Sequence, residues 1–316
     1  MISTDVGLAA DRIRAGGVVA MPTETVYGLA ADARNRAAVA RIFEIKGRPT
    51  DHPLIVHLGS AAEVTQWAAD VPSTAVRLAA TCWPGPLTML LVRHPDVDDR
   101  VTGGRPTIGL RVPSHPLAQA LLGRVGSGLA APSANRFGKV SPTTAQHVLD
   151  DLGTLLDPER DLILDGGPSA VGVESTIVDL TVDPPQVLRA GAISTDDLRR
   201  LLAADVAEAS GPSRASGMLT SHYAPACAVE PVGDRATADA VAERRRAGGE
   251  RVDVLDRTDD LVVAANRLYA DLRAADAAAL DRLVVVLPPA SGLGHAIRDR
   301  LFKASTVRPD PASPTG

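Results

Sequence analysis

The chain has 316 residues, of which 45% are hydrophobic and 22% charged, and its formal net charge is −5 at pH 7. At roughly 100–200 residues per domain, this length predicts two domains. The acidic balance argues against a protein that grips a nucleic-acid backbone over a broad face, and two distant cysteines, Cys82 and Cys227, indicate neither a structural zinc site nor a disulfide framework.

The first predicted elements are a helix, a strand and a second helix. Residues 5–15 form an amphipathic pattern that a Gly-Gly pair ends, and residues 18–21 then predict a buried strand. Asn35 can cap a helix over 36–46, with Gly47 at its C′ position. The N-terminal stretch has no basic head followed by an apolar run, so it does not match a signal peptide. We therefore expect a cytoplasmic protein without a membrane partner.

The chain continues with strands and helices in alternation. Ser60 and Ser73 can each cap a further helix, and residues 193–203 predict a capped helix. Strands are predicted at 53–58, 86–92, 107–112, 128–131, 162–165 and 175–180. This order predicts an α/β sheet domain over residues 1–208.

A linker and a second domain follow. Residues 209–226, ASGPSRASGMLTSHYAPA, have the Gly, Ser, Pro and Ala content of a linker. A plain linker does not need His222 and Tyr223, so we expect it to contact something as well. From residue 227 three strands alternate with three helices, which predicts a small parallel α/β domain over 227–316. Neither GxGxxG nor GxxxxGK[ST] occurs, so the Rossmann fingerprint and the P-loop are both missing.

The stretch EIKGRPTDHPLIVH (44–57) gathers Lys46, Arg48, His52 and His57 around glycine and prolines. One cation at a helix C-terminus is explained by the helix dipole. Four such side chains fit an anion receptor better, for example one that binds a nucleotide phosphate. The chain has only three lysines among its 33 basic residues, so Lys46 either needs a compact point charge or is a lysine by chance.

Two further segments carry candidate anion ligands. In TIGLRVPS, Thr107, Gly109 and Arg111 share one face of a strand, and Arg111 could clamp a carboxylate or form a salt bridge on a solvated face. In APSANRFGKVSPTTA (131–145), Ser141 at the N-cap and Pro142 at N1 predict a helix start. Its N-terminus could bind phosphate, although a plain capped helix explains the same residues.

Hydroxyl side chains follow two other predicted strands. PTETVYGL (22–29) supplies Thr23 and Thr25, and GVEST (172–176) supplies Ser175. No Ser-His-Asp, Cys-His or HExxH arrangement accompanies them. The sequence therefore favours a site that positions and neutralises anions over one with a covalent nucleophile.

Together the motifs resemble a known family. PTETVYGL, IFEIKGRPTDHPLIVHL, WPGPLT, TIGLRVPSHP, APSANRFGKVSPT, GVESTIVDL, VLRAGAI and SGMLTSHYAP occur in that order, and this resembles the YrdC-type threonylcarbamoyl-AMP synthases in their long two-domain form. The resemblance covers nearly the whole chain, with the C-terminal region matching chiefly through GLGHAIRDRLFKAS. It implies a YrdC-like twisted mixed sheet domain with helices, followed by a small Rossmann-like parallel α/β domain.

The resemblance also implies an activity. Such a nucleotidyltransferase converts L-threonine, bicarbonate and ATP to threonylcarbamoyl-AMP, pyrophosphate and water, for threonylcarbamoyladenosine in tRNAs that read ANN codons. Mg²⁺ would come with the ATP phosphates and not be held by protein side chains, and no organic cofactor is implied. A separate tRNA threonylcarbamoyl transferase complex would be a transient partner, and stable direct tRNA binding is not expected.

The family's site residues map onto this chain by motif. Lys46 and Arg48 match its catalytic KxR motif, and Ser133 and Asn135 match its SxN motif. The residues implied for L-threonine are Thr25, His57, Arg111, Ala131 through its backbone, and Ser175. Those implied for ATP are Arg48, His52, Thr107, Ser133, Asn135, Ser141, Arg189 and Tyr223, with Tyr223 covering the nucleotide from a lid formed by the linker.

The sequence departs from the family's motifs at two places, and three other functions are alternatives to the synthase. His52 stands where the family commonly has Asn, and SGMLTSHYAP lacks the Pro and the basic residues usual before HYAP. An RNA-binding module is disfavoured by 3% aromatic content, since stacking platforms need aromatic rings. Carbamoyl transfer in metal-enzyme maturation is disfavoured because such proteins carry extra Cys-rich and acylphosphatase-like regions. A regulatory protein would bind ATP without releasing pyrophosphate.

Overall fold

The computed structural model describes residues 1–210, 214–215 and 223–306, and it divides into two compact units. The first unit consists of Met1–Phe137 and Ser141–Met218, and the second of Gly138–Val140 and Leu219–Gly316. The division thus falls within the segment 209–226 that the composition indicates as a linker. Of that segment, 211–213 and 216–222, which include His222, lie outside the described residues.

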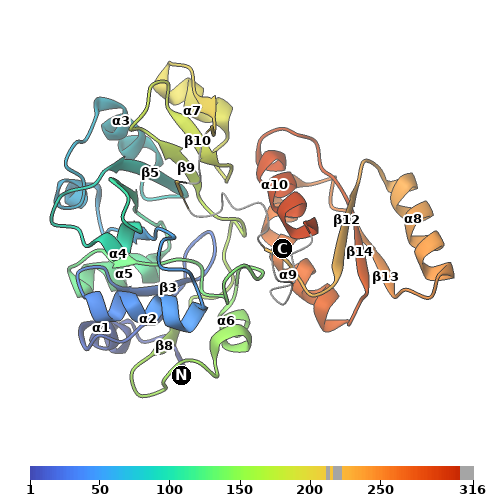
Figure 1. The fold of residues 1–316 in the computed structure, drawn as a ribbon, viewed down its shortest axis with the longest axis horizontal. Coiled ribbons are helices and arrows are strands. Elements are labelled where there is room, and N and C mark those ends of the chain that lie inside the picture. Colours follow the sequence, from blue (N-terminus) through green and yellow to red (C-terminus); the bar gives the residue numbers. More distant parts are fainter. Residues whose placement is uncertain (211–213, 216–222, 307–316) are drawn as a thin grey trace, which may run out of the picture. The chain divides into compact units, whose positions relative to one another are not determined.

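The first unit is built on a mixed sheet (Figure 1). Over the described residues its strand order is β1-β8-β2-β3-β7-β4-β6-β5-β9-β10-β11, with both parallel and antiparallel neighbours. The strands are β1 (Ile2–Ser3), β2 (Val19–Met21), β3 (Gly28–Asp32), β4 (Ile55–His57), β5 (Leu87–Val92), β6 (Thr107–Arg111), β7 (Leu129–Ala130), β8 (Leu162–Leu164), β9 (Thr176–Asp179), β10 (Gln186–Arg189) and β11 (Ala207–Glu208). The predicted mixed sheet is confirmed.

The sheet of the first unit is buried on both faces. Val18 and Ala20 belong to one hydrophobic cluster, while Val19 and Met21 belong to another. Alternate residues of a strand point to opposite faces, so both faces of β2 are covered. This explains why the predicted strand 18–21 is a continuous hydrophobic run and does not alternate with polar residues.

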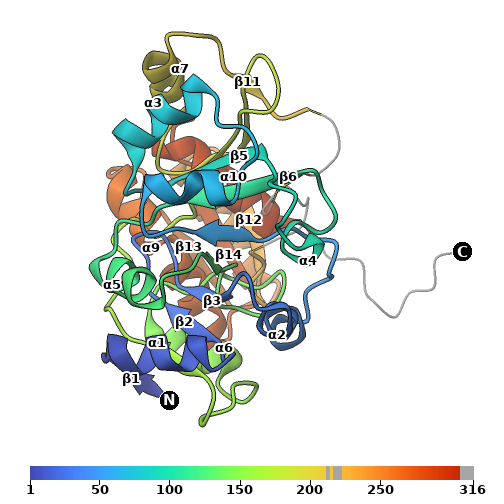
Figure 2. The same ribbon diagram turned by 90° about the vertical axis from the view of Figure 1, so that its left-hand side faces the viewer.

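Helices cover these faces. They are α1 (Val6–Arg14), α2 (Arg36–Lys46), α3 (Ser73–Cys82), α4 (Asp99–Thr102), α5 (Pro116–Val125), α6 (Ala145–Leu152) and α7 (Thr195–Leu202), with a 3₁₀ helix η1 (Ala61–Gln66). Helix α3 lies beside α7, and α1 packs against α5 (Figure 2). Asn35 caps α2 as predicted. Ser73 is instead the first residue of α3, whose N-cap position is held by Pro72 without a side-chain capping bond, and Ser60 precedes η1 without such a bond either.

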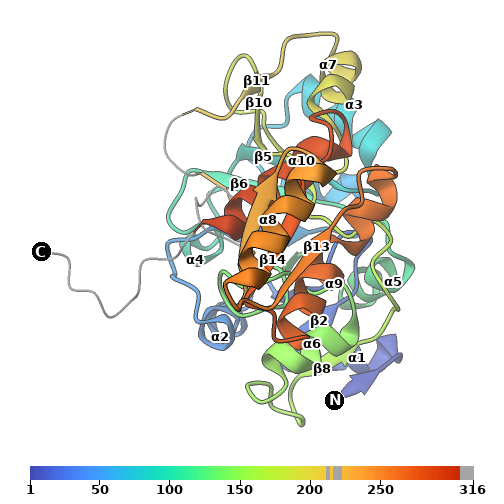
Figure 3. The same cartoon turned by 90° about the vertical axis from the view of Figure 1, so that its right-hand side faces the viewer.

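The second unit is a three-stranded parallel sheet with helices on both faces. Its strands β12 (Ala228–Val232), β13 (Val252–Leu255) and β14 (Arg282–Val286) lie in the order β12-β14-β13. Helix α8 (Arg235–Ala247) crosses one face, and α9 (Leu261–Ala277) and α10 (Leu293–Ser305) pack on the other (Figure 3). The predicted alternation of three strands and three helices is confirmed. No helix among the described residues is both long and apolar enough to cross a membrane.

The predicted helix start at Ser141-Pro142 is wrong. Helix α6 begins three residues later and is capped by Thr144, whose side chain accepts from His147 N. The Ser141 hydroxyl donates instead to Glu174, and the Pro142 carbonyl accepts from Tyr27 N, so contacts distant in sequence hold this segment outside the helix. Because the helix does not begin at Ser141, the backbone amides that follow Ser141 do not form a helix N-terminus that could bind phosphate.

Candidate active site

The first unit buries many of the polar side chains that the sequence indicates for ligand binding. Those with little exposed surface are Thr25, Lys46, Arg48, His57, Arg111, Asn135, Ser141, Ser175 and Arg189. Buried charge is costly unless it is paired or hydrogen-bonded, so such a group is unusual in a plain core. The arrangement indicates a built polar site within this unit.

Lys46 connects the basic KxR motif, of which it is part, to the polar SxN motif. It is the last residue of α2, and its ammonium donates hydrogen bonds to the backbone carbonyls of Ser133, at 2.5 Å, and Asn135. Burial, and then the neighbouring Arg48, hold the Lys46 pKa well below its usual value, although Asp151 opposes them. The predicted KxR and SxN motifs therefore meet at one ammonium group.

Arg48 and His52 meet around an aromatic ring. The Arg48 guanidinium lies 5.5 Å from the centroid of the Phe137 ring, and its Nη2 donates to the Pro53 carbonyl at 2.9 Å. The His52 ring packs edge-on against Phe137 with centroids 5.3 Å apart. Burial, followed by the Arg48 charge, lowers the His52 pKa. Sequence reasoning proposed Arg48 and His52 but missed Phe137, whose ring contacts both.

His57 and Arg111 occupy paired positions on the parallel strands β4 and β6. Burial, and then the Arg111 charge, lower the His57 pKa to about 3, so the imidazole is neutral at physiological pH. Its Nδ1 is buried and has no hydrogen-bond partner among the described residues. Arg111 donates through Nε to the Gly85 carbonyl at 3.3 Å, and its Nη2 lies 2.8 Å from a carboxylate oxygen of Glu24.

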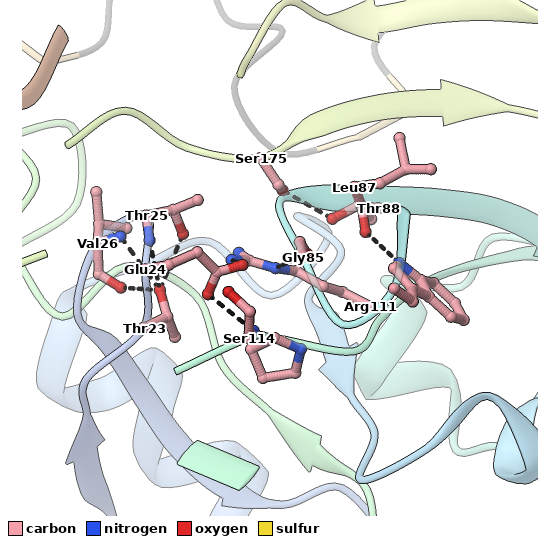
Figure 4. Close-up of polar contacts among 12 residues, drawn as sticks. Thr23, Glu24, Thr25, Val26, Gly85, Leu87, Thr88, Arg111, Ser114 and Ser175 are labelled. Atoms are coloured by element: carbon pink, nitrogen blue, oxygen red, sulfur yellow. Dashed lines mark hydrogen bonds and ion pairs between the residues drawn. The ribbon is translucent and has the colours of Figure 1, made fainter. Parts of the chain in front are cut away.

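Ser175, from the predicted threonine set, contacts Arg189, from the predicted ATP set, and Figure 4 shows its contact with Thr88. Its hydroxyl lies 2.8 Å from the Thr88 hydroxyl and accepts from Arg189 Nη2 at 3.0 Å. Arg189 Nε also donates to the Ser175 carbonyl at 3.0 Å. A residue implied for threonine therefore contacts one implied for ATP, and two substrates bound through them would lie close together.

Three more predicted positions form hydrogen bonds of their own within the first unit. The Thr25 hydroxyl lies 2.9 Å from that of Thr23, the Ala131 amide donates to Ile55 at 3.0 Å, and the Ser141 hydroxyl donates to Glu174 at 2.6 Å. Thr25 and Ser141 are fully buried. The hydroxyl groups of Thr25 and Ser141 and the backbone amide of Ala131 are thus each engaged within the protein.

Two predicted residues lie apart from these contacts. Thr107 begins β6, half-buried, on the face that also carries Arg111. Tyr223 belongs to the second unit, where its buried ring stacks on Tyr269 with centroids 5.7 Å apart and lies under the Arg300 guanidinium at 5.2 Å. Tyr223 therefore contacts two residues of its own unit, Tyr269 and Arg300.

Sequence reasoning missed two buried acids, Glu24 and Glu174. Both stand inside motifs that it singled out, PTETVYGL and GVEST, next to hydroxyl residues that were proposed. An acid within an apolar, hydroxyl-rich segment at a strand edge is the signal that could have found them. Among the described residues, no group of three or more His, Cys, Asp or Glu side chains could hold a metal ion.

Comparison with known proteins places both units. Residues 11–191 match a Sua5/YciO/YrdC family described as "Telomere recombination", and residues 193–306 match "Threonylcarbamoyl-AMP synthase, C-terminal domain". A threonylcarbamoyl-AMP synthase of Pyrococcus abyssi is 36% identical over 95% of this chain and 94% of its own. One of Bacillus subtilis is 37% identical over 95% of this chain and 92% of its own.

A solved structure agrees with these matches. The crystal structure of P. abyssi Sua5 complexed with L-threonine superposes with a TM-score of 0.90, covering 95% of this chain and 94% of that one. The identity is 36%, and the 95% of this chain that is covered includes residues of both units. The chain belongs to the Sua5/YrdC family of threonylcarbamoyl-AMP synthases, enzymes of the nucleotidyltransferase type.

Proposed function

We propose that this enzyme makes threonylcarbamoyl-AMP from L-threonine, bicarbonate and ATP, and releases pyrophosphate and water. The observation that carries the proposal is the Lys46 ammonium, which is buried against the Ser133 and Asn135 carbonyls. Among the described residues it forms no ion pair with a carboxylate. An ammonium has three donors, so one hydrogen-bonding position remains for an anionic ligand.

The amino-acid end of the site is proposed to contain Thr25, His57, Arg111, the Ala131 backbone and Ser175. A relative of known structure was crystallised with L-threonine, which supports this choice of ligand. The Arg111 guanidinium would bind the α-carboxylate through two nitrogens. The neutral His57 imidazole offers the buried Nδ1 to a polar group of the same ligand.

The nucleotide end is proposed to contain Arg48, His52, Thr107, Ser133, Asn135, Ser141 and Arg189. The amine of threonine would first be converted to a carbamate, whose oxygen would then attack the α-phosphorus and displace pyrophosphate. Two anions must meet in this step, so Lys46 and Arg48 would offset negative charge as the reacting groups approach. With buried cations and no acidic cluster among the described residues, the donor set fits Mg²⁺ held by ATP phosphates, where it would offset phosphate charge.

The product's proposed use is threonylcarbamoyladenosine formation in tRNAs that read ANN codons. A separate transferase complex would place it on tRNA through a transient encounter, which suits a chain of net charge −5. ATP and tRNA are both abundant in the cytoplasm, where we place the reaction. The lid expected from the linker falls on a segment of which residues 211–213 and 216–222 lie outside the described residues.

Pyrophosphate release from Mg-ATP by the purified full chain tests the proposal. We expect release that requires both L-threonine and bicarbonate, and threonylcarbamoyl-AMP as the accompanying product. ATP binding without release under any combination of substrates would instead identify a regulatory nucleotide-binding protein and overturn the proposed reaction.

A further inference from the structure

Glu24 lies in the amino-acid end of the site, although no motif comparison proposed it. Its side chain is buried and points toward Arg111 (Figure 4). The carboxylate Oε1 lies 2.8 Å from Arg111 Nη2, with only 10% and 5% of the two side chains exposed. The other oxygen, Oε2, accepts from the Ser114 amide at 3.2 Å. Arg111 and the Ser114 amide therefore hold the Glu24 carboxylate in place, and Arg111 is the residue that would bind the substrate's carboxylate.

The Glu24 and Arg111 atoms that face each other retain hydrogen-bonding capacity. Glu24 Oε1 and Arg111 Nη2 are both buried and form an ion pair at 2.8 Å. Each atom makes this one contact and has a second hydrogen-bonding position, since a carboxylate oxygen has two lone pairs and a guanidinium Nη carries two hydrogens. Buried polar atoms in folded proteins are normally hydrogen-bonded, and leaving them unbonded destabilises the fold. His57 Nδ1, on the strand paired with that of Arg111, is buried and has no hydrogen-bond partner among the described residues. An ion pair with spare hydrogen-bonding positions next to this imidazole nitrogen indicates groups arranged for a ligand.

The group contains one negative side chain, Glu24, one positive side chain, Arg111, and one neutral side chain, His57. Burial raises the Glu24 pKa, but the charge and the side-chain hydrogen bond of Arg111, followed by backbone hydrogen bonds, outweigh it, so the pKa lies below its usual value and the acid is ionised. His57 is neutral. A carboxylate and a guanidinium thus stand 2.8 Å apart. The α-ammonium and α-carboxylate of an amino acid hang from one carbon, roughly 3 Å apart by standard bond lengths, and have the complementary arrangement of charge.

We propose that Glu24 determines specificity for the amino group: its carboxylate receives the α-ammonium of the amino-acid substrate while Arg111 binds the α-carboxylate. This inference rests on the proposed function, since it concerns the same amino-acid site. The pair would select zwitterions over acids that lack the amine. Because the pKa of Glu24 is lowered, its carboxylate is a weaker base than an ordinary glutamate, so its role is to bind and orient the amine and not to deprotonate it.

The test compares two ligands that differ in one group. Binding of L-threonine and of the 2,3-dihydroxybutanoate with matching stereochemistry is measured by calorimetry on the full-length wild type and on Glu24→Gln. We expect the wild type to prefer threonine by at least about tenfold. Glu24→Gln should lose about tenfold for threonine and little for the hydroxy acid, so the preference collapses. Glu174→Gln, which changes the other missed acid, should keep the preference.

Each contrary outcome has its own meaning. Equal losses for both ligands in Glu24→Gln would show that Glu24 only orients Arg111, and would overturn the inference while threonine-dependent pyrophosphate release kept the proposed function. A wild type without preference would overturn it as well, and that measurement stands even if the variant does not fold. Binding of neither ligand to the wild type would overturn the inference and the proposed function together.

Discussion

The Lys46 ammonium donates a 2.5 Å hydrogen bond to the Ser133 carbonyl, which joins the end of α2 to a loop 87 residues further along the chain. The same ammonium reaches the Asn135 carbonyl. Replacing it with an apolar side chain leaves two carbonyls without their donor and removes a charge from the site. We expect Lys46→Met to lower turnover by on the order of 10²-fold or more in a pyrophosphate-release assay, if the ammonium acts on the transition state.

The control for this prediction is Lys303→Met. Lys303 is an ammonium in the second unit, where it pairs with Asp299 at 2.7 Å on the same helix. Its loss should leave turnover near the wild-type value. Undiminished turnover in Lys46→Met would remove Lys46 from the mechanism, whatever the effect on stability.

Gly47 separates Lys46 from Arg48, and its backbone adopts the left-handed conformation with φ of 60°. Alanine in this region costs about 1 kcal/mol, because a Cβ crowds the following carbonyl. The added Cβ would also lie 3.1 Å from Arg136 Nη2. We expect Gly47→Ala to lose about 1 kcal/mol of unfolding free energy in denaturant titration, and to lower turnover by about tenfold because the neighbouring cations shift.

Gly126 supplies a matched control. It ends α5 with φ of 70°, and a Cβ there meets no atom within 4 Å. Gly126→Ala should lose a similar free energy while keeping wild-type turnover. If both variants lose turnover equally, the effect of Gly47→Ala is a general loss of stability and not a displacement of Lys46 and Arg48.

Local chemistry explains which elements were predictable. The predicted helix 36–46 agrees with α2 because the Asn35 side chain accepts from Ala37 and Ala38 amides at its start, and Gly47 ends it. By contrast, β3 has the sequence GLAAD, which carries no strand pattern. It is a strand because it pairs with β2 and β7. Interactions between distant segments override weak local preference there.

The sequence predicts the basic residues of the site but not its acidic residues. Motifs singled out Lys46 and Arg111 because each basic residue stands beside glycine or in a strand with a polar face. The role of Glu24 depends on Arg111, 87 residues away, and on the Ser114 amide, so no local pattern reveals it. Ser141 was misjudged for the same reason, since its hydroxyl donates to Glu174 and does not cap a helix.

The neutral, buried His57 predicts acid sensitivity. Its pKa falls from 6.5 to about 3 on folding, so the unfolded chain binds the extra proton between these values. Stability from this group is complete above about pH 6.5 and is lost as the pH falls toward 3, by up to about 1.4 kcal/mol per pH unit. We expect His57→Asn to be less stable at neutral pH but to show a shallower fall in unfolding free energy between those limits.

The comparison for His57→Asn is Val56→Ala. Val56 is the fully buried neighbour on β4, so its truncation removes packing without removing a titrating group. This variant should be destabilised by a similar amount at every pH and keep the wild-type slope. A His57→Asn slope equal to that of the wild type would show that other groups cause the acid sensitivity.

The lowered Lys46 pKa predicts proton uptake when nucleotide binds. Burial, with Arg48 next in effect, disfavours the charged ammonium in the free enzyme. Phosphate oxygens beside it would favour the charged form and raise its pKa, so binding draws a proton from solvent and weakens as the pH rises past the free-state value. Calorimetric titration with Mg-ATP in two buffers of different ionisation enthalpy measures the uptake, at several pH values below the ordinary lysine pKa. We expect up to one proton for the wild type and a smaller number for Lys46→Met. Equal uptake by both proteins at every pH would assign the proton to another group.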